Sequence, residues 1–248
     1  MAKKERTDKL LVDRGLAESE AKARAMVMAG VVLIDEKRVE KPSEQFDMIA
    51  AIRIKGELPE SKYVSRGGLK LQKALEFFHI CPDGYVCMDV GSSTGGFTDC
   101  LLQHGAARVV AVDSGTNQIV WKLRKDPRVD VRENTNARNF TPADFVERFD
   151  LAVVDVSFIS VTKILPAIIP LLKDDGKIVI LIKPQFEVRR GEVGEGGVVR
   201  EPQKHQRVID EVNALAVELG LSVSGVTDSP ILGAEGNKEF LALYEPRG

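Results

Sequence analysis

Residues 176–187 read GKIVILIKPQFE, with five consecutive aliphatic residues at 178–182 that run directly into a lysine. Such an apolar run is typical of a strand covered on both faces, as in a parallel sheet packed between helices. Lys183 then stands at the carboxyl end of the strand, the edge where open α/β sheets bind their ligands. Lysines at strand ends are also ordinary solvated residues, so both interpretations of Lys183 are open at this point.

Strand and helix patterns alternate from residue 85 onward. Strands are expected at residues 85–90, 107–113, 128–134, 150–156, 177–183, 221–229 and 239–245. Helices are expected at residues 67–78, 96–105, 118–125, 143–149 and 163–173, and from Pro202 to a stop at Gly220. Strands joined by helices form right-handed crossovers and a mainly parallel sheet. The expected fold class is therefore α/β and Rossmann-like, with a mostly parallel seven-stranded sheet and an antiparallel last strand.

The first part of the chain has a different pattern of expected helices and strands. Thr7 and Ser19 are suited to cap two helices, the second of which ends at Gly30, and short strands are expected at residues 31–34, 37–41 and 48–54. Glycine, proline and charged residues interrupt all periodicity near residues 55–64. We therefore predict a small α+β domain at residues 1–58, a linker at 59–64 and an α/β domain at 65–248.

Composition excludes some classes of protein. The 248 residues include 35 Lys and Arg against 37 Asp and Glu, so any nucleic-acid contact must come from a local patch. Three cysteines without a C-x-x-C pair suggest a reducing compartment. The longest nearly apolar stretch is far shorter than a membrane span. We expect a cytoplasmic protein with no membrane association, no metal and no obligatory protein partner.

A glycine-rich turn follows the first strand of the larger domain. Residues 89–96 read DVGSSTGG and open into a helix, where α/β sheets hold nucleotide-like ligands. Ser93 stands where the NAD fingerprint needs its second glycine, which disfavours a dinucleotide. Asp113, 22 residues after Gly91, can accept hydrogen bonds from ribose hydroxyls. The combination favours S-adenosylmethionine, although glycines that merely permit a tight turn are the alternative.

The expected cofactor contacts come from the turn, from the ends of the next strands and from one asparagine. They are Asp89, Gly91, Ser92, Ser93, Thr94, Gly95, Gly96, Phe97, Asp113, Asn136 and Asp155. Asp155 also belongs to a second group. It ends the strand expected beside that of Lys183, while Glu239 begins the last strand and Lys70 lies on the helix before the first one. Because neighbouring parallel strands end together, these two lysines and two carboxylates are expected to converge.

The four residues match the K-D-K-E tetrad of FtsJ-like RNA 2′-O-methyltransferases, and five stretches of the chain resemble the TlyA family. In chain order they are SRGGLKL, DVGSSTGGFTD, VDVSFIS, IKPQFE and NKEF. The resemblance implies a Rossmann-like methyltransferase domain and a small N-terminal αL RNA-binding domain. It also implies methyl transfer from S-adenosylmethionine to a ribose 2′-hydroxyl of ribosomal RNA, usually of cytidines. Lys183 would lie nearest the hydroxyl, with Asp155, Glu239 and Lys70 placing it and tuning its charge.

Ribosomal RNA or ribosomal subunits are the expected partner. Residues 1–62 hold 13 Lys and Arg against 12 Asp and Glu, so the RNA contacts must be individual side chains. The predicted contacts are Arg6, Arg14, Lys22, Arg24, Lys62 and Arg66. Solvated helix faces are the alternative for each of them. For the whole chain, the alternatives are a non-catalytic RNA-binding protein on a methyltransferase fold and a membrane-active hemolysin, a name that the family often carries.

Overall fold

The computed structural model describes residues 4–247 except residues 36, 49, 51 and 55–61. The chain divides into two compact units, Met1–Ser65 and Arg66–Gly248. Half of the linker predicted at residues 59–64, residues 59–61, lies outside the described residues, and the domain boundaries stay a prediction.

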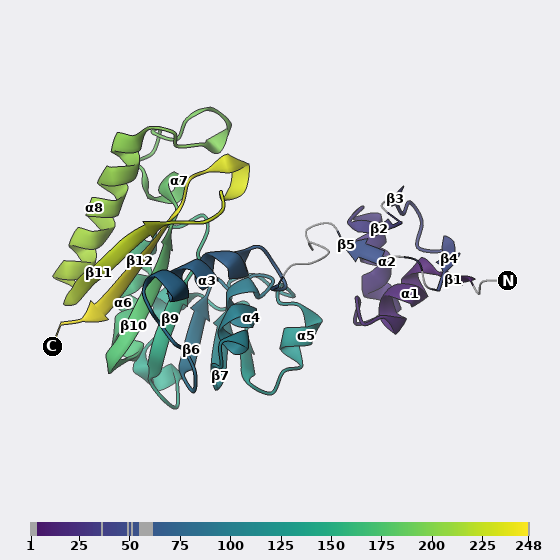
Figure 1. Cartoon of the computed structure of the whole chain (residues 1–248), viewed down its shortest axis with the longest axis horizontal. Coiled ribbons are helices and arrows are strands. Elements are labelled where there is room, and N and C mark those ends of the chain that lie inside the picture. Colours follow the sequence, from purple (N-terminus) through teal and green to yellow (C-terminus); the bar gives the residue numbers. More distant parts are fainter. Residues whose placement is uncertain (1–3, 36, 49, 51, 55–61, 248) are drawn as a thin grey trace. The chain divides into compact units, whose positions relative to one another are not determined.

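The N-terminal unit packs two helices against short strands (Figure 1). Its elements are β1 (Lys4–Arg6), α1 (Thr7–Asp13), α2 (Glu20–Met28), β2 (Val32–Ile34), β3 (Lys37–Arg38), β4 (Gln45–Asp47) and β5 (Ile52–Ile54). β2 pairs with β3 and β5, and β1 pairs with β4, in each case antiparallel. Ser19 caps α2 as predicted, because its hydroxyl accepts a hydrogen bond from the backbone N–H of Lys22. The cap predicted for Thr7 is wrong, since Thr7 is the first residue of α1 and its hydroxyl donates to the carbonyl of Glu44 at 3.0 Å. Leu11, Val27 and Ile34 belong to the small core between these elements.

The C-terminal unit is built on a seven-stranded sheet (Figure 1). In spatial order its strands are β11 (Leu221–Asp228), β12 (Phe240–Pro246), β10 (Leu172–Ile182), β9 (Phe149–Val154), β6 (Val86–Val90), β7 (Arg108–Val112) and β8 (Val129–Arg132). The five strands from β10 to β8 pair in parallel, whereas β12 is antiparallel to both neighbours. The predicted mostly parallel sheet with an antiparallel last strand is therefore confirmed.

Helices cover both faces of this sheet. α6 (Leu165–Ile168) and α8 (Pro202–Glu218) pack with the strand residues at even positions, such as Val90, Val154 and Ile182. α3 (Gly67–Phe77) and α4 (Gly96–Gln103) contact each other and lie against strands including β12 and β7. Side chains along a strand point alternately to the two faces of the sheet. The odd-numbered residues directly after β9 and β10, and directly before β12, therefore face the side of α3 and α4. This places charged strand-end residues beside Lys70 of α3.

Two predicted helices are interrupted or absent. The helix expected at residues 143–149 is wrong, because a 3-10 turn at Pro142–Asp144 is followed by bends at residues 146 and 147, where Val146 is 99% exposed and offers no buried face. The helix expected at residues 163–173 is reduced to α6 between the 3-10 turns Val161–Lys163 and Ile169–Leu171. Proline residues at 166 and 170 lack the N–H groups that a continuous helix needs.

The helix expected at residues 118–125 is also shorter, and covers only α5 (Trp121–Arg124). The carboxylate of Glu133 accepts hydrogen bonds from the backbone N–H groups of residues 117–119, which holds that segment outside the helix. α8 begins at Pro202 as predicted, and Gly220 follows its end with a φ of 88°. A short helix, α7 (Pro184–Glu187), follows β10 directly. Among the helices of the described residues, none has the length and apolar character that crossing a bilayer requires.

Candidate active site

Lys183 is held by the segment that follows the neighbouring strand. Its Nζ lies 2.5 Å from Oδ1 of Asp155, which is within ion-pair distance. The angles at this contact are not those of a hydrogen bond. The same nitrogen donates a hydrogen bond to Oγ of Ser157 at 2.9 Å. Lys183 is only 8% exposed, which is unusual for a lysine and excludes a freely solvated strand end. The amine is therefore fixed by one carboxylate and one hydroxyl.

A second buried ion pair lies next to the first along the sheet edge. Nζ of Lys70 on α3 is 2.5 Å from Oε2 of Glu239, and both residues are buried. The ladder between β10 and β12 ends with Ile182 opposite Phe240, so Lys183 and Glu239 occupy the next positions. The structure thus brings the four predicted residues together as two ion pairs from four different elements. Their catalytic roles stay a prediction.

A cavity of about 580 Å³ opens beside Asp155 at the carboxyl ends of the parallel strands. Its volume suits a small organic ligand. Five of the predicted cofactor residues line it, namely Gly91, Ser93, Asp113, Asn136 and Asp155. The lining also includes residues that the sequence did not single out, among them Gln118, Thr135, Arg138, Ser157 and Phe158.

The other six predicted cofactor residues are not among those that line the cavity. Thr94, Gly95, Gly96 and Phe97 do not line the cavity, and Phe97 is buried within α4. Gly95 has a φ of 99°, and a Cβ there would lie 2.3 Å from Cδ1 of Leu123. The tight turn between β6 and α4 therefore requires glycine at this position, and a contact of Gly95 with the cofactor stays a prediction.

Polar groups around the turn have bonding capacity left for a ligand. Oδ1 of Asp89 and Oγ of Ser92 are buried and have no hydrogen-bond partner among the described residues. Asp113 accepts hydrogen bonds from the backbone N–H groups of Ser93 at 2.8 Å and Gly115 at 2.7 Å, and each oxygen can accept one more. The residues therefore fit a ligand with a ribose near Asp113 and a donor or cationic group near Asp89.

Asp89 makes the stability of the ligand-free protein depend on pH. Burial raises the pKa of Asp89 to about 7, although a hydrogen bond from Thr98 opposes the rise. A carboxyl group in an unfolded chain titrates near 3.8, so the cost of ionising Asp89 in the fold grows between about pH 4 and pH 7. Each pKa unit corresponds to about 1.4 kcal/mol.

We therefore expect Asp89→Asn to raise the thermal unfolding midpoint of the ligand-free protein at pH 8 more than at pH 5. The substitution removes a buried charge that exists mainly at the higher pH. Unfolding followed by calorimetry at both pH values measures the effect. Equal or lower stability of the variant at pH 8 would contradict this account of Asp89.

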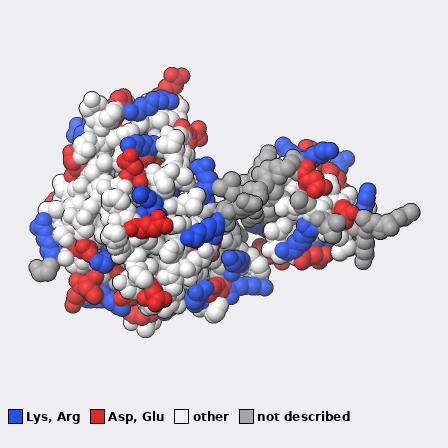
Figure 2. Space-filling model, in the orientation of Figure 1, with Lys and Arg blue, Asp and Glu red and all other residues white. Residues whose placement is uncertain are grey.

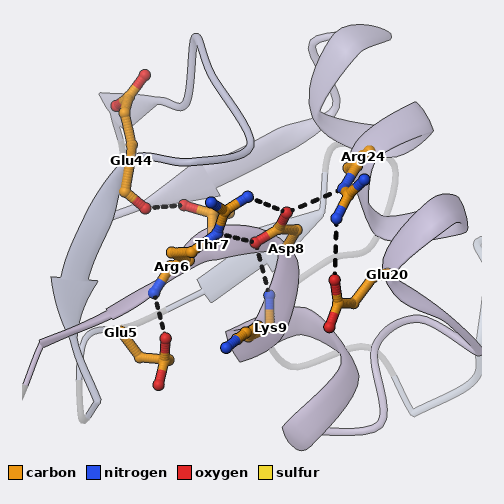
Figure 3. Close-up of polar contacts among 8 residues, drawn as sticks. All are labelled: Glu5, Arg6, Thr7, Asp8, Lys9, Glu20, Arg24 and Glu44. Atoms are coloured by element: carbon orange, nitrogen blue, oxygen red, sulfur yellow. Dashed lines mark hydrogen bonds and ion pairs between the residues drawn. The ribbon is translucent and has the colours of Figure 1, made fainter.

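Two of the predicted RNA contacts meet at a buried carboxylate in the N-terminal unit. Arg6 donates two hydrogen bonds to Asp8, at 3.0 and 2.7 Å, and Arg24 donates one at 3.1 Å (Figure 3). Arg24 also pairs with Glu20 at 2.9 Å. Because each guanidinium has five N–H donors, donors remain on both arginines for a phosphate.

The other predicted RNA contacts differ in their surroundings. Arg14 donates to the carbonyl groups of Ala50 and Met48, which ties its guanidinium to the protein backbone. Lys22 is exposed on α2, Lys62 lies over the ring of Tyr63 at 5.2 Å, and Arg66 donates to the carbonyl of Leu232 at 3.4 Å. Positive and negative side chains are interspersed over the face in view of each unit (Figure 2). All six RNA contacts stay predictions.

Asp8 is expected to stabilise the N-terminal unit in a pH-dependent way. The hydrogen bonds from Arg6 lower the pKa of Asp8 to about 2, against the effect of its burial. The stabilisation is present above about pH 4 and is lost as the pH falls towards 2, with a size of about 2 kcal/mol. Asp8→Asn should accelerate hydrogen exchange of the α1 and α2 amides in the full chain at pH 7. Glu20→Gln, which leaves all Asp8 contacts in place, is the control, and equal exchange in both variants would refute the role.

Comparison with known proteins identifies both units. The model of the FtsJ-like methyltransferase family matches residues 63–245, and that of the S4 domain matches residues 5–48. A relative from Mycobacterium tuberculosis, named 16S/23S rRNA (cytidine-2'-O)-methyltransferase TlyA, is 47% identical over 97% of this chain and 89% of its own length. Hemolysin A from Brachyspira hyodysenteriae is 40% identical over 96% of this chain and 99% of its own length. A solved structure from Streptococcus thermophilus, provisionally named a hemolysin, has a TM-score of 0.75 at 47% identity and covers 99% of this chain and 90% of that one.

Proposed function

The chain belongs to the FtsJ-like methyltransferase family and to its TlyA group, and from this premise we propose that it transfers a methyl group from S-adenosylmethionine to a ribose 2′-hydroxyl of ribosomal RNA. The observation that carries the proposal is the pair of buried ion pairs, Lys183 with Asp155 and Lys70 with Glu239, beside a ligand-sized cavity. We take cytidine as the target nucleoside because the Mycobacterium tuberculosis relative is named for it.

The cavity residues support the choice of cofactor. S-adenosylmethionine supplies a methyl group that is already activated on a sulfonium. Asp113, which lines the cavity, would bind its ribose, since each of its carboxylate oxygens can accept one more hydrogen bond. Because the methyl group is activated, the protein must mainly align the 2′-oxygen and remove the hydroxyl proton.

Lys183 is the residue that we assign to the hydroxyl. Asp155 and Ser157 hold its amine, which leaves one position on the nitrogen for the 2′-oxygen. The amine acts either as the base that takes the proton or as the donor that orients the hydroxyl. Lys70 and Glu239 form their own ion pair nearby.

Ribose methylation mapped on ribosomal RNA tests this function. Purified protein, methyl-labelled S-adenosylmethionine and ribosomal subunits should yield label on a 2′-oxygen, and a 2′-deoxy nucleotide at the mapped position should abolish it. Binding of both ligands without transfer would instead favour the non-catalytic alternative. Lysis of liposomes by the purified protein, without transfer, would favour the membrane activity that the hemolysin names suggest.

We also propose that the N-terminal residues 1–58 bind ribosomal RNA, and that the protein acts in the cytoplasm where that RNA is found. The matching S4 domain and the exposed Lys22 support the RNA contact. Deleting residues 1–54 should lower the affinity for ribosomal RNA and flatten its dependence on salt, because fewer phosphates are contacted. Filter binding at 50 and 200 mM salt measures both effects. Cofactor binding serves as the folding control, and unchanged RNA affinity would rule out the role.

A further inference from the structure

Glu187 lies on α7, four residues after Lys183, and contacts the segment that follows β9. Its Oε2 accepts a hydrogen bond from Oγ of Ser160 at 2.5 Å, and its Oε1 accepts one from the backbone N–H of Val161 at 2.8 Å. Burial raises the pKa of Glu187, while the two hydrogen bonds act in the opposite direction. The contact is therefore a specific one, made by a carboxylate that is partly removed from water.

Segment 155–161 is consequently anchored at both ends by one short stretch of chain. Lys183 contacts Asp155 and Ser157 at its beginning, and Glu187 contacts Ser160 and Val161 at its end. The two anchoring residues are rigidly linked, because the turn of α7 between them is closed by a hydrogen bond from the N–H of residue 186 to the carbonyl of residue 183. A shift of one end of the segment is therefore coupled to the other.

The middle of the segment is conformationally strained. Phe158 has a φ of 64° and a 92% exposed side chain, and it lines the cavity. A bulky residue rarely adopts this left-handed conformation unless its surroundings impose it. The anchors at the two ends, together with the ring of Phe186 at 5.3 Å from that of Phe158, supply such constraints. Loss of one anchor would let the segment relax.

We propose that Glu187 is a positioning residue for methyl transfer, which fixes segment 155–161 so that Asp155 and Ser157 hold the Lys183 amine in its working place. Glu187 itself contacts neither the cavity nor the amine, since its partners are Ser160 and Val161. The inference rests on the proposed function, because it needs a reaction to position. It predicts slower turnover in a protein that is folded and still binds cofactor and RNA.

Glu187→Ala removes both hydrogen bonds, and we expect kcat to fall about 10- to 100-fold, since misplacing a reacting group by about 1 Å has effects of this size. The KM for RNA should change by less than about 3-fold, as expected for an interaction used only in the transition state. Glu187→Gln keeps the size and one acceptor oxygen and should recover part of the rate. The control is Glu192→Gln, which removes an acid that pairs with Arg207 on α8, outside the segment.

A double-mutant cycle separates positioning from stability. If Glu187 acts through the Lys183 amine, its loss should matter less once Ser157 is alanine, so the two rate losses should not multiply. Ser160→Ala removes one partner of Glu187 from the other side and should give a smaller loss of kcat, which tests the idea even if Glu187→Ala does not fold. Full turnover in Glu187→Ala, losses that multiply, or losses that follow the thermal unfolding midpoint would each overturn the proposal. A wild-type protein without methyl transfer would instead refute the proposed function.

Discussion

Lys183→Ala is expected to lower kcat for methyl transfer by about 10³-fold or more while S-adenosylmethionine still binds, because proton transfer by a positioned side chain typically contributes 10²- to 10⁴-fold. The substitution removes the only amine that Asp155 and Ser157 hold at the cavity, as far as the described residues show. The cavity lining does not include Lys183 itself, so cofactor affinity should change little. Single-turnover methylation and calorimetry measure the two effects separately.

Lys177→Ala is the matched control. Lys177 lies on β10, six residues before Lys183. It also pairs with a carboxylate, that of Glu245. Its loss should leave kcat unchanged within about 3-fold, as for a surface ion pair. Because removing one partner of a buried ion pair is destabilising, the unfolding midpoint of Lys183→Ala must be measured as well. A folded Lys183→Ala protein with normal turnover would eliminate the assigned role of the lysine.

Gly91→Ala is expected to abolish cofactor binding and to destabilise the C-terminal unit. Gly91 has a φ of 87°, and a Cβ at this position would lie 2.2 Å from the backbone carbonyl oxygen of Asp155. This oxygen belongs to the backbone at the end of β9, a central strand, and cannot move aside as a flexible side chain can. The turn or the strand must therefore shift. Either shift deforms the cavity wall and displaces Asp155, which holds the Lys183 amine.

Gly84→Ala separates steric overlap from backbone strain. Gly84 has a φ of 73°, similar to that of Gly91, but a Cβ there would meet no atom within 4 Å. We expect Gly84→Ala to cost about 1 kcal/mol of stability, the price of the left-handed conformation alone, and to keep full cofactor affinity. Titration calorimetry and thermal unfolding of both variants provide the comparison. Wild-type affinity in Gly91→Ala would show that the glycine turn does not shape the cofactor site.

The sequence was sufficient to predict the sheet and the convergence of the four charged residues. The mainly parallel arrangement follows from strands joined by helices, and strand-end positions follow from long apolar runs such as residues 178–182. Once these are known, Asp155 and Lys183 must end neighbouring strands. Periodicity does not extend into loops, however, and so it gave no reason to select Ser157 or Glu187.

The wrong and incomplete predictions have local physical causes. The sequence pattern favours a helix at residues 143–149, but Phe145 packs edge-on against Phe149 at 5.2 Å, and the chain between them bends. The amphipathic pattern also does not reveal that Arg14 donates to backbone carbonyls, because those carbonyls belong to residues more than 30 positions later in the chain. Contacts of this kind depend on tertiary structure.

The interior position of β12 has a consequence for how the protein matures. β12 is the last strand in chain order, yet it inserts between β10 and β11. Until residues 240–246 arrive, the aliphatic edge of β10 has no partner, and open edges of this kind favour aggregation. Closing the sheet requires pairing of segments distant along the chain, which is a slow event in folding. Glu239 directly precedes that strand, so on the role proposed for it a nascent chain can transfer a methyl group only after the sheet is complete.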